Sequence, residues 1–409
     1  EVISELNNKS GVRDAEVSHA SITTGSGSFG GGSITVNIAV AYGKGSSIAS
    51  ASAKKSMSIG RSGAYGDIIV KSLGGANTKA DSANVSKGKS FAAALIMVFA
   101  YNDATFSSKL ELPTGATAYA KAVTVSTDYV ANATTDLTPS LGGVSLNGIE
   151  AEANLTAAVS FANAQASISG AGTLNAHGDV DVSATGTAKA TSTVSGVTVD
   201  ISFAKIAVNL SFAEVTAKQV ASIDKTIINT NGGTISVTST FNDASATGAV
   251  ATVGGNGTST DVKVNIVGGT ASIAAADMDA TVKATTSGVS LDTSDGKGGF
   301  GTVDVKVKAR SYASADIIVP SVGISLLNAT LLFTYATAGG TFAAELGIGN
   351  AKESNVGTTT VDDTYSSIAT SATGPAGGVG VTLADVKVNV SIATASSSAT
   401  AALTGVGTL

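Results

Sequence analysis

The sequence predicts an all-β fold: an elongated β-solenoid, in the form of a right-handed β-helix, over residues 1–409 as a single repetitive domain. Three observations lead to this prediction. Apolar and polar residues alternate with period two, short blocks recur about every 55 residues, and the composition favours strands. A string of β-sandwich modules of about 55 residues is the alternative, and modules that short bury too little surface to be stable without staples.

Alternation is clearest in residues 178–202, which read GDVDVSATGTAKATSTVSGVTVDIS. Small or apolar residues occupy the even positions from Val180 to Val194, which is the strand period and not the helical one. The phase reverses at residues 195–196 and again before Ile206. We interpret each reversal as a corner after which the other set of side chains turns inward. Inward residues this small predict closely spaced sheets.

The repeat is marked by similar blocks, such as GDIIVKS at Gly66, GDVDVSA at Gly178 and GTVDVKV at Gly301. The predicted repeat starts lie near residues 11, 66, 121, 178, 233, 301 and 357, which gives about seven repeats. The interval from 233 to 301 is longer by about a dozen residues, and we assign the excess to a turn insertion near residues 288–300. Because one winding cannot bury its own faces, stacked windings are required. We expect two per repeat.

The composition agrees with strands and excludes disorder. The chain is 43% hydrophobic, 5% aromatic and 13% charged, with 48 Gly and 4 Pro. A disordered chain needs low hydrophobicity and high net charge. The most apolar run, FAAALIMVFAY at residues 91–101, is too short to cross a bilayer as a helix, so we expect a buried strand.

Charge and cysteine content narrow the function classes. The net charge is -6 and Arg13, Arg61 and Arg310 are the only arginines, so nucleic acid is excluded as a partner. The chain has no cysteine, which excludes disulfides and thiolate metal sites and suits a protein exported unfolded. The sequence opens at Glu1 without a signal-peptide pattern, and we interpret it as a mature or excised segment.

Units of the form G-D-V-x-V-x-A, followed by alternating Ala, Thr and Ser and then a Val-rich strand, resemble a family. They are similar to the repeats of large bacterial surface exoproteins, namely haemagglutinin-like and leukotoxin-like adhesins of the autotransporter or two-partner type. The closest stretches are GDVDVSATGTAKATSTVSG and GTISVTSTFNDASATGAVATVGG. This resemblance implies a non-enzymatic, rod-like protein at the cell surface.

Candidate sites are few. Asp292 and Asp295, next to GKGG, could offer oxygen ligands to Ca²⁺, as could Asp362 with Asp363, although an Asp-Gly turn accounts for the first pair. No other cofactor is expected. His19 and His177 are the only histidines, and without cysteine they leave no nucleophile–base pair or zinc site, so we interpret His177 as a solvated corner residue.

Lys306, Arg310 and Asp304 are the residues that could serve a polysaccharide-cleaving β-helix. Their alternation places them on the outward side of one strand, where solvated charges are the simpler interpretation.

We therefore expect an extracellular structural or adhesive protein that forms a rod or surface fibre and does not span a membrane. Its partners would be itself, through end-to-end or lateral assembly, and glycans or proteins of a host or neighbouring cell. A chain that shows no polar capping element at either end points to excision from a longer rod or to head-to-tail assembly. The alternative is a carbohydrate-binding or carbohydrate-cleaving β-helix, which predicts a groove with carboxylates, basic residues and stacking aromatics.

Overall fold

The computed structural model describes residues 1–6, 16–27, 33–55, 58–63, 65–87, 91–139, 145–195, 199–243, 248–254, 261–349, 354–376 and 380–405. Every regular element in these ranges is a β-strand, so the all-β prediction is confirmed. The same ranges contain no helix of the length and hydrophobicity that a bilayer crossing requires.

The strands pair in parallel and form three sheets, in which β16 and β17 each contribute to two. Sheet I contains β1 (Val2–Leu6), β2 (Glu16–Gly27), β5 (Ile68–Lys87), β8 (Val123–Pro139), β11 (Val180–Val194), β14 (Ile235–Phe241), β15 (Ala249–Val253), the first part of β17 (Val303–Ile348) and β18 (Thr359–Ala376). Sheet II contains β3 (Ser33–Ser52), β6 (Phe91–Glu111), β9 (Ser145–Ser169), β12 (Val199–Asp224), β16 (Asp261–Asp292), the second part of β17 and β19 (Gly380–Gly405). Sheet III is short and contains β4 (Ser58–Ile59), β7 (Thr117–Ala120), β10 (Thr173–Ala176), β13 (Ile227–Thr230) and the end of β16.

One repeat makes one winding, not the two that we expected. Each winding runs along sheet I, returns along sheet II and crosses sheet III before the next begins. The register shows this directly, because the valine at the fifth position of a repeat block pairs with its counterpart one repeat away. This ladder consists of Val70, Val125, Val182, Val237, Val305 and Val361. The two-coil expectation fails because single strands here run for 20 residues or more without a corner.

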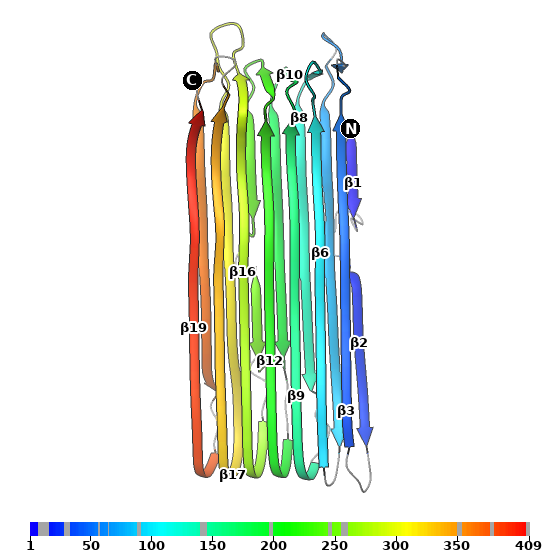
Figure 1. Ribbon diagram of the computed structural model, residues 1–409, viewed down its shortest axis with the longest axis vertical. Coiled ribbons are helices and arrows are strands. Elements are labelled where there is room, and N and C mark those ends of the chain that lie inside the picture. Colours follow the sequence, from blue (N-terminus) through cyan, green and yellow to red (C-terminus); the bar gives the residue numbers. More distant parts are fainter. Residues whose placement is uncertain are drawn as a thin grey trace.

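The windings are long and flat, so the strand direction is the longest axis of the molecule (Figure 1). At about 3.3 Å per residue, the 25 residues of β9 span about 80 Å. The seven strands of sheet II in the described chain stack over only about 30 Å, at about 4.8 Å per strand. The solenoid is therefore a broad slab that is shorter along the stacking direction than along the strands (Figure 1).

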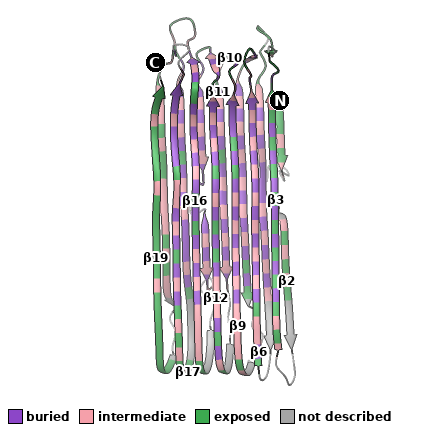
Figure 2. Cartoon of the chain, viewed as in Figure 1, coloured by how far each residue is buried: buried purple, intermediate pink, exposed green. Residues whose placement is uncertain are grey.

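Small side chains fill the space between sheets I and II, as the sequence predicts. Buried and partly exposed residues alternate along the strands (Figure 2), and alanine is the commonest buried residue. Gly186 shows why: a Cβ atom there would overlap the ring of Tyr129, which is itself 1% exposed. At one corner, a Cβ on Gly301 would overlap the backbone of Gly233 in the preceding winding, so a glycine there permits close stacking.

One half of sheet II departs from the sequence prediction. We expected Ile206, Val208, Leu210 and Phe212 to face inward after a corner. They lie outward on β12, which continues without a corner, and the thin interior takes Ala207, Ser211 and Ala213 instead. The run at residues 91–101 behaves likewise, since it is a strand but its outward residues, such as Leu95, stay partly exposed.

Outward apolar side chains continue in register across all seven sheet II strands of the described chain. They form four rows of seven residues, which we call the apolar band. The band consists of the alternate outward positions, first to last, of residues 34–40, 93–99, 151–157, 206–212, 269–275, 329–335 and 386–392. Its only polar side-chain atom is the hydroxyl of Tyr335.

The insertion expected near residues 288–300 holds only part of the excess length. The register offset is already 63 residues between Asn229 and Asp292 and reaches 68 between Ile235 and Val303, so five of the extra residues lie in this tight loop between sheets III and I. The other eight enter earlier in the winding, where the offset rises from 55 residues at Ile235 to 63 at Val262. Ser294 and Phe300 form an antiparallel bridge, and the backbone N of Asp295 donates to the carbonyl of Gly299 at 2.9 Å. Pairing resumes in phase after the loop, with Ile235 opposite Val303. The repeat start expected near residue 11 lies outside the described residues.

Candidate binding groove

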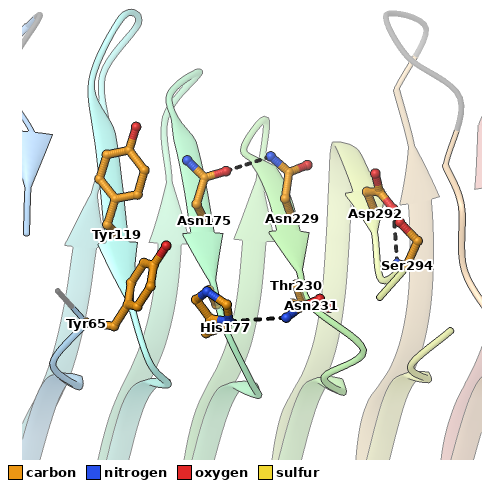
Figure 3. Close-up of a pocket in the computed structure, with 10 residues that line it drawn as sticks. Tyr65, Tyr119, Asn175, His177, Asn229, Thr230, Asn231, Asp292 and Ser294 are labelled. Carbon is orange, nitrogen blue, oxygen red and sulfur yellow. Dashed lines mark hydrogen bonds between the residues drawn. The ribbon is translucent and has the colours of Figure 1, made fainter. Parts of the chain in front are cut away.

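An open groove of about 370 Å³ crosses the outer face of sheet III, at the narrow edge of the molecule (Figure 3). It runs across successive windings, so each contributes one or two side chains. Its lining consists of Tyr65, Tyr119, Asn175, Ala176, His177, Asn229, Thr230, Asn231, Asp292 and Ser294.

The first row of the groove is a ladder of outward residues. Alternation along the short strands buries Ala118, Leu174 and Ile228 and turns their neighbours outward. Asn175 consequently lies between Tyr119 and Asn229, and Asp292 follows Asn229 in the ladder. The side-chain amide of Asn229 donates to Oδ1 of Asn175 at 2.8 Å, which fixes the orientation of both amides. These two carboxamides form the floor between an aromatic end and an acidic end.

The second row lies at the corner that leads into sheet I (Figure 3). The rings of Tyr65 and His177 meet edge to face, with centroids 4.2 Å apart. On its other side, Nδ1 of His177 lies 3.2 Å from the side-chain nitrogen of Asn231, within hydrogen-bonding distance. His177 is exposed, as expected for a corner residue, but it also takes part in the groove wall.

The two calcium candidates have separate roles. Asp292 lines the groove, and its Oδ1 accepts hydrogen bonds from the backbone N and the Oγ of Ser294, at 3.1 and 2.8 Å. Oδ1 of Asp295 accepts from the backbone N of Lys297 and Gly299, at 2.7 and 2.8 Å, and these bonds hold the pKa of Asp295 below its usual value. Asp295 therefore closes the insertion loop as an Asx turn.

In the part of the chain that the structure describes, no group of three or more His, Cys, Asp or Glu residues is placed so that it could hold a metal ion. In the other candidate pair, Asp362 with Asp363, one carboxylate is hydrogen-bonded to the backbone. Oδ2 of Asp363 accepts from the backbone N of Thr400 at 3.0 Å, and burial raises the pKa of Asp363. Asp362 is exposed.

The residues considered for polysaccharide cleavage lie on the outer face of sheet I and not in the groove. Lys306 and Asp304 form an ion pair at 3.2 Å, and the guanidinium of Arg310 lies 5.8 Å from the ring centre of Tyr312. His19 also lies on sheet I, where its Nε2 is 2.6 Å from Oδ1 of Asp81. None of these residues therefore lies beside His177 in the sheet III groove.

The groove combines two tyrosine rings, three side-chain amides and one carboxylate. Tyrosine offers an apolar face with a polar tip, and amides offer both donors and acceptors, so the set suits a neutral ligand rich in hydroxyl groups. Glycosidic hydrolysis generally uses two carboxylates about 5 to 10 Å apart. Asp292 is the only carboxylate in the groove lining, so the geometry fits binding better than cleavage.

The groove residues leave only a weak signal in the sequence. The groove residues occur just before the repeat starts, in AYGD, AYAK, NAHGD, NTNGG and DTSDG. The first two segments contribute tyrosine, the next two asparagine and the last aspartate, so no single motif repeats through all of them. The pairing of successive windings places them on one face.

Comparisons with known proteins found no match to this chain among protein-family models, curated proteins or solved structures.

Proposed function

We propose that the chain is a non-enzymatic, extracellular structural and adhesive segment of a bacterial surface fibre, of the haemagglutinin-like or leukotoxin-like kind that its repeats resemble. One observation carries the proposal: equivalent residues of successive repeats pair directly, so parallel backbone ladders continue through every winding of the described chain. Such ladders transmit load through many hydrogen bonds at once and leave few loops for proteases to attack.

End-to-end assembly is part of this proposal. Among the described strands, β3 pairs only with β6 and β19 pairs only with β17. Each of these terminal strands has a free edge with unpaired backbone groups, which can accept another winding. A second copy that stacks its first winding on the last would make a heterologous contact, which propagates as a filament.

Electron microscopy of the purified chain over a range of concentrations tests this. We expect particles that lengthen along the stacking direction as concentration rises, with a repeat of about 4.8 Å in that direction. Particles of one size at every concentration would refute end-to-end assembly, and a helical circular dichroism spectrum would refute the fold on which the proposal rests.

Glycan binding at the sheet III groove is a second candidate function, favoured by its tyrosine and amide lining. A screen of soluble neutral oligosaccharides would identify a ligand. Tyr119→Ala is then expected to weaken binding about tenfold, which corresponds to about 1.4 kcal/mol. Tyr312→Ala, on the outer face of sheet I, is the matched control and should leave affinity unchanged. Cleavage of any oligosaccharide in the screen would contradict a binding role without catalysis.

A further inference from the structure

The apolar band is the largest feature of the surface that neither the ladders nor the groove explains. Several of its side chains are strongly exposed, among them Ile34 at 76%, Ile206 at 62% and Val386 at 63%. An apolar patch on a soluble monomer is typically no larger than about 300–600 Å². Four rows on seven strands cover about 900 Å², taking about 6.6 Å between rows and about 4.8 Å between strands. A surface of this size needs a partner.

On β9 and β12 the inward side beneath the band is largely polar, so the band there is not a core face turned out by a local slip, whereas on β6 Ile96 and Val98 are inward and buried. Lys205 points inward with its side chain 4% exposed, and its Nζ lies 3.3 Å from Glu150 and 3.9 Å from Glu152. The side-chain amide of Asn154 donates to Glu152 and to Asn209, at 2.8 and 2.9 Å. The side of these strands with the greater need for burial therefore faces away from the chain.

The surroundings of the band favour a protein partner over an anionic lipid surface. The next outward position on β12 and on β16 is acidic, Glu214 and Asp277, and Asp279 follows on β16. All three are exposed, and the whole chain has a net charge of -6. Anionic headgroups attract clusters of Lys and Arg, so they would be repelled by this border.

We infer that the apolar band is the interface for a second copy of this chain, with two molecules packed sheet II against sheet II. Two bands bury about 1,800 Å² in total, which lies in the usual range for specific dimers of about 1,200–2,000 Å². Homodimer interfaces are also the most apolar class. The two copies pack as the layers of a sandwich, about 10 Å apart. This lateral contact uses the outer face of sheet II, so it does not depend on end-to-end stacking.

Sedimentation velocity of the full chain tests the inference. We expect a species of twice the 39.7 kDa chain mass that does not grow further through this face, because a self-complementary contact closes. Leu210→Lys with Phe333→Lys, two outward changes inside the band, should weaken dimerisation about a hundredfold or more. Thr185→Lys with Thr238→Lys, outward on sheet I, is the matched control and should leave the dimer intact. Circular dichroism checks that both variants keep the β-sheet spectrum.

A labelling experiment keeps the test valid if the lysine variant does not fold. The chain has no cysteine, so Leu155→Cys in the band and Thr185→Cys on sheet I each provide one thiol. Maleimide should label the first at least about tenfold more slowly than the second at high concentration, with equal rates after dilution. Three results would overturn the inference: a monomer at all concentrations, a dimer that persists after Leu210→Lys with Phe333→Lys, or equal labelling rates of the two thiols at high concentration. Flotation with phosphatidylcholine–phosphatidylglycerol vesicles would do so too, since the band would then bind lipid. If the purified chain forms an open series of oligomer sizes and Leu210→Lys with Phe333→Lys abolishes that series, the contact through the band is not a closed dimer and the inference is contradicted. If the variant keeps the series, the series arises from end-to-end stacking alone.

Discussion

Sheet I and sheet II line the same interior, yet their outer faces have opposite character. On sheet I the outward residues are mainly Thr, Ser, Asp and Lys, as in Asp181, Ser183 and Thr185 on β11, and the inward ones are Val and Ala. On the first half of several sheet II strands, such as β9 and β12, the order is inverted. The apolar band faces out, while Glu150, Lys205 and other polar groups face in.

The difference teaches which positions the fold constrains. The narrow space between the sheets limits side-chain volume, and both small apolar and small polar residues satisfy that limit. Small polar residues can pair there, as Ser211 does by donating to the carbonyl and the hydroxyl of Ser192, both at 2.9 Å. The outer faces carry no such limit, so their composition reflects what they contact. Polar residues on sheet I suit water, and the apolar band suits burial.

We expect the largest difference in stability between a variant that removes a lysine from the inner face of sheet II and one that removes a lysine from the outer face of sheet I. Lys205→Met leaves Glu150 and Glu152 as acidic groups in the interior and is expected to lower the free energy of unfolding by about 3 kcal/mol. Lys306→Met breaks an exposed pair with Asp304 and should cost less than about 1 kcal/mol. Urea unfolding of both variants measures the difference. Equal losses would mean that the sheet II interior is open to water.

Adding volume to the interior should have the next largest effect. Gly186→Val places side-chain atoms against the ring of Tyr129, which is fully enclosed and stacked on Phe106, and is expected to cost about 1–3 kcal/mol. Thr185→Val, one residue earlier and outward, is the control and should change stability by less than about 0.5 kcal/mol. Thermal melting compares the two. A tolerated Gly186→Val would show that the sheets can separate.

Acidic residues on the two outer faces should respond oppositely to pH. For Asp81 on sheet I, burial raises the pKa but hydrogen bonds to Ser21 and His19 and the nearby charges of Lys79 and His19 outweigh it, so the pKa is lowered. A lowered folded-state pKa stabilises the fold above the unfolded value of about 3.9 and loses this effect as pH falls through the folded value.

For Asp277 on sheet II, burial and then the charge of Asp279 raise the pKa, so ionisation disfavours the fold. That pKa shift favours the fold at acidic pH, and its contribution is lost as pH rises through the folded value. Asp81→Asn should therefore lower the melting temperature at neutral pH, and Asp277→Asn should raise it. Both differences should vanish in acid and stay below about 1 kcal/mol, because solvent screens both groups. Shifts of the same sign for the two variants would contradict the assignment.

The sequence predicts much of the fold. Period-two alternation and the repeated block lead to parallel, stacked strands, and the ladder from Val70 to Val361 follows the predicted starts. Two predictions were wrong: that each repeat makes two windings, and that the more hydrophobic side of the sheet II strands faces inward. Alternation identifies the two sides of a strand but not which side faces in, and Ile206 to Phe212 are the more hydrophobic set.

The groove was harder to predict. Asp292 was the only residue of its first row among the candidates, and it was considered for calcium. Tyr119, Asn175 and Asn229 are each separated by a whole winding, and the residue type changes along the row from Tyr to Asn to Asp. Their proximity depends on how long each winding is, which the alternation pattern does not determine.

The insertion loop has a practical consequence. The chain accommodates about five extra residues between Asp292 and Val303, where the register offset between windings rises from 63 to 68 residues, while Ile235 and Val303 remain opposite each other. The bend between two sheets therefore accepts foreign sequence without disturbing the ladder on either side. An epitope or affinity tag placed within Asp295 to Gly299 would be displayed at the narrow edge of the slab, which makes the protein a scaffold for presenting peptides.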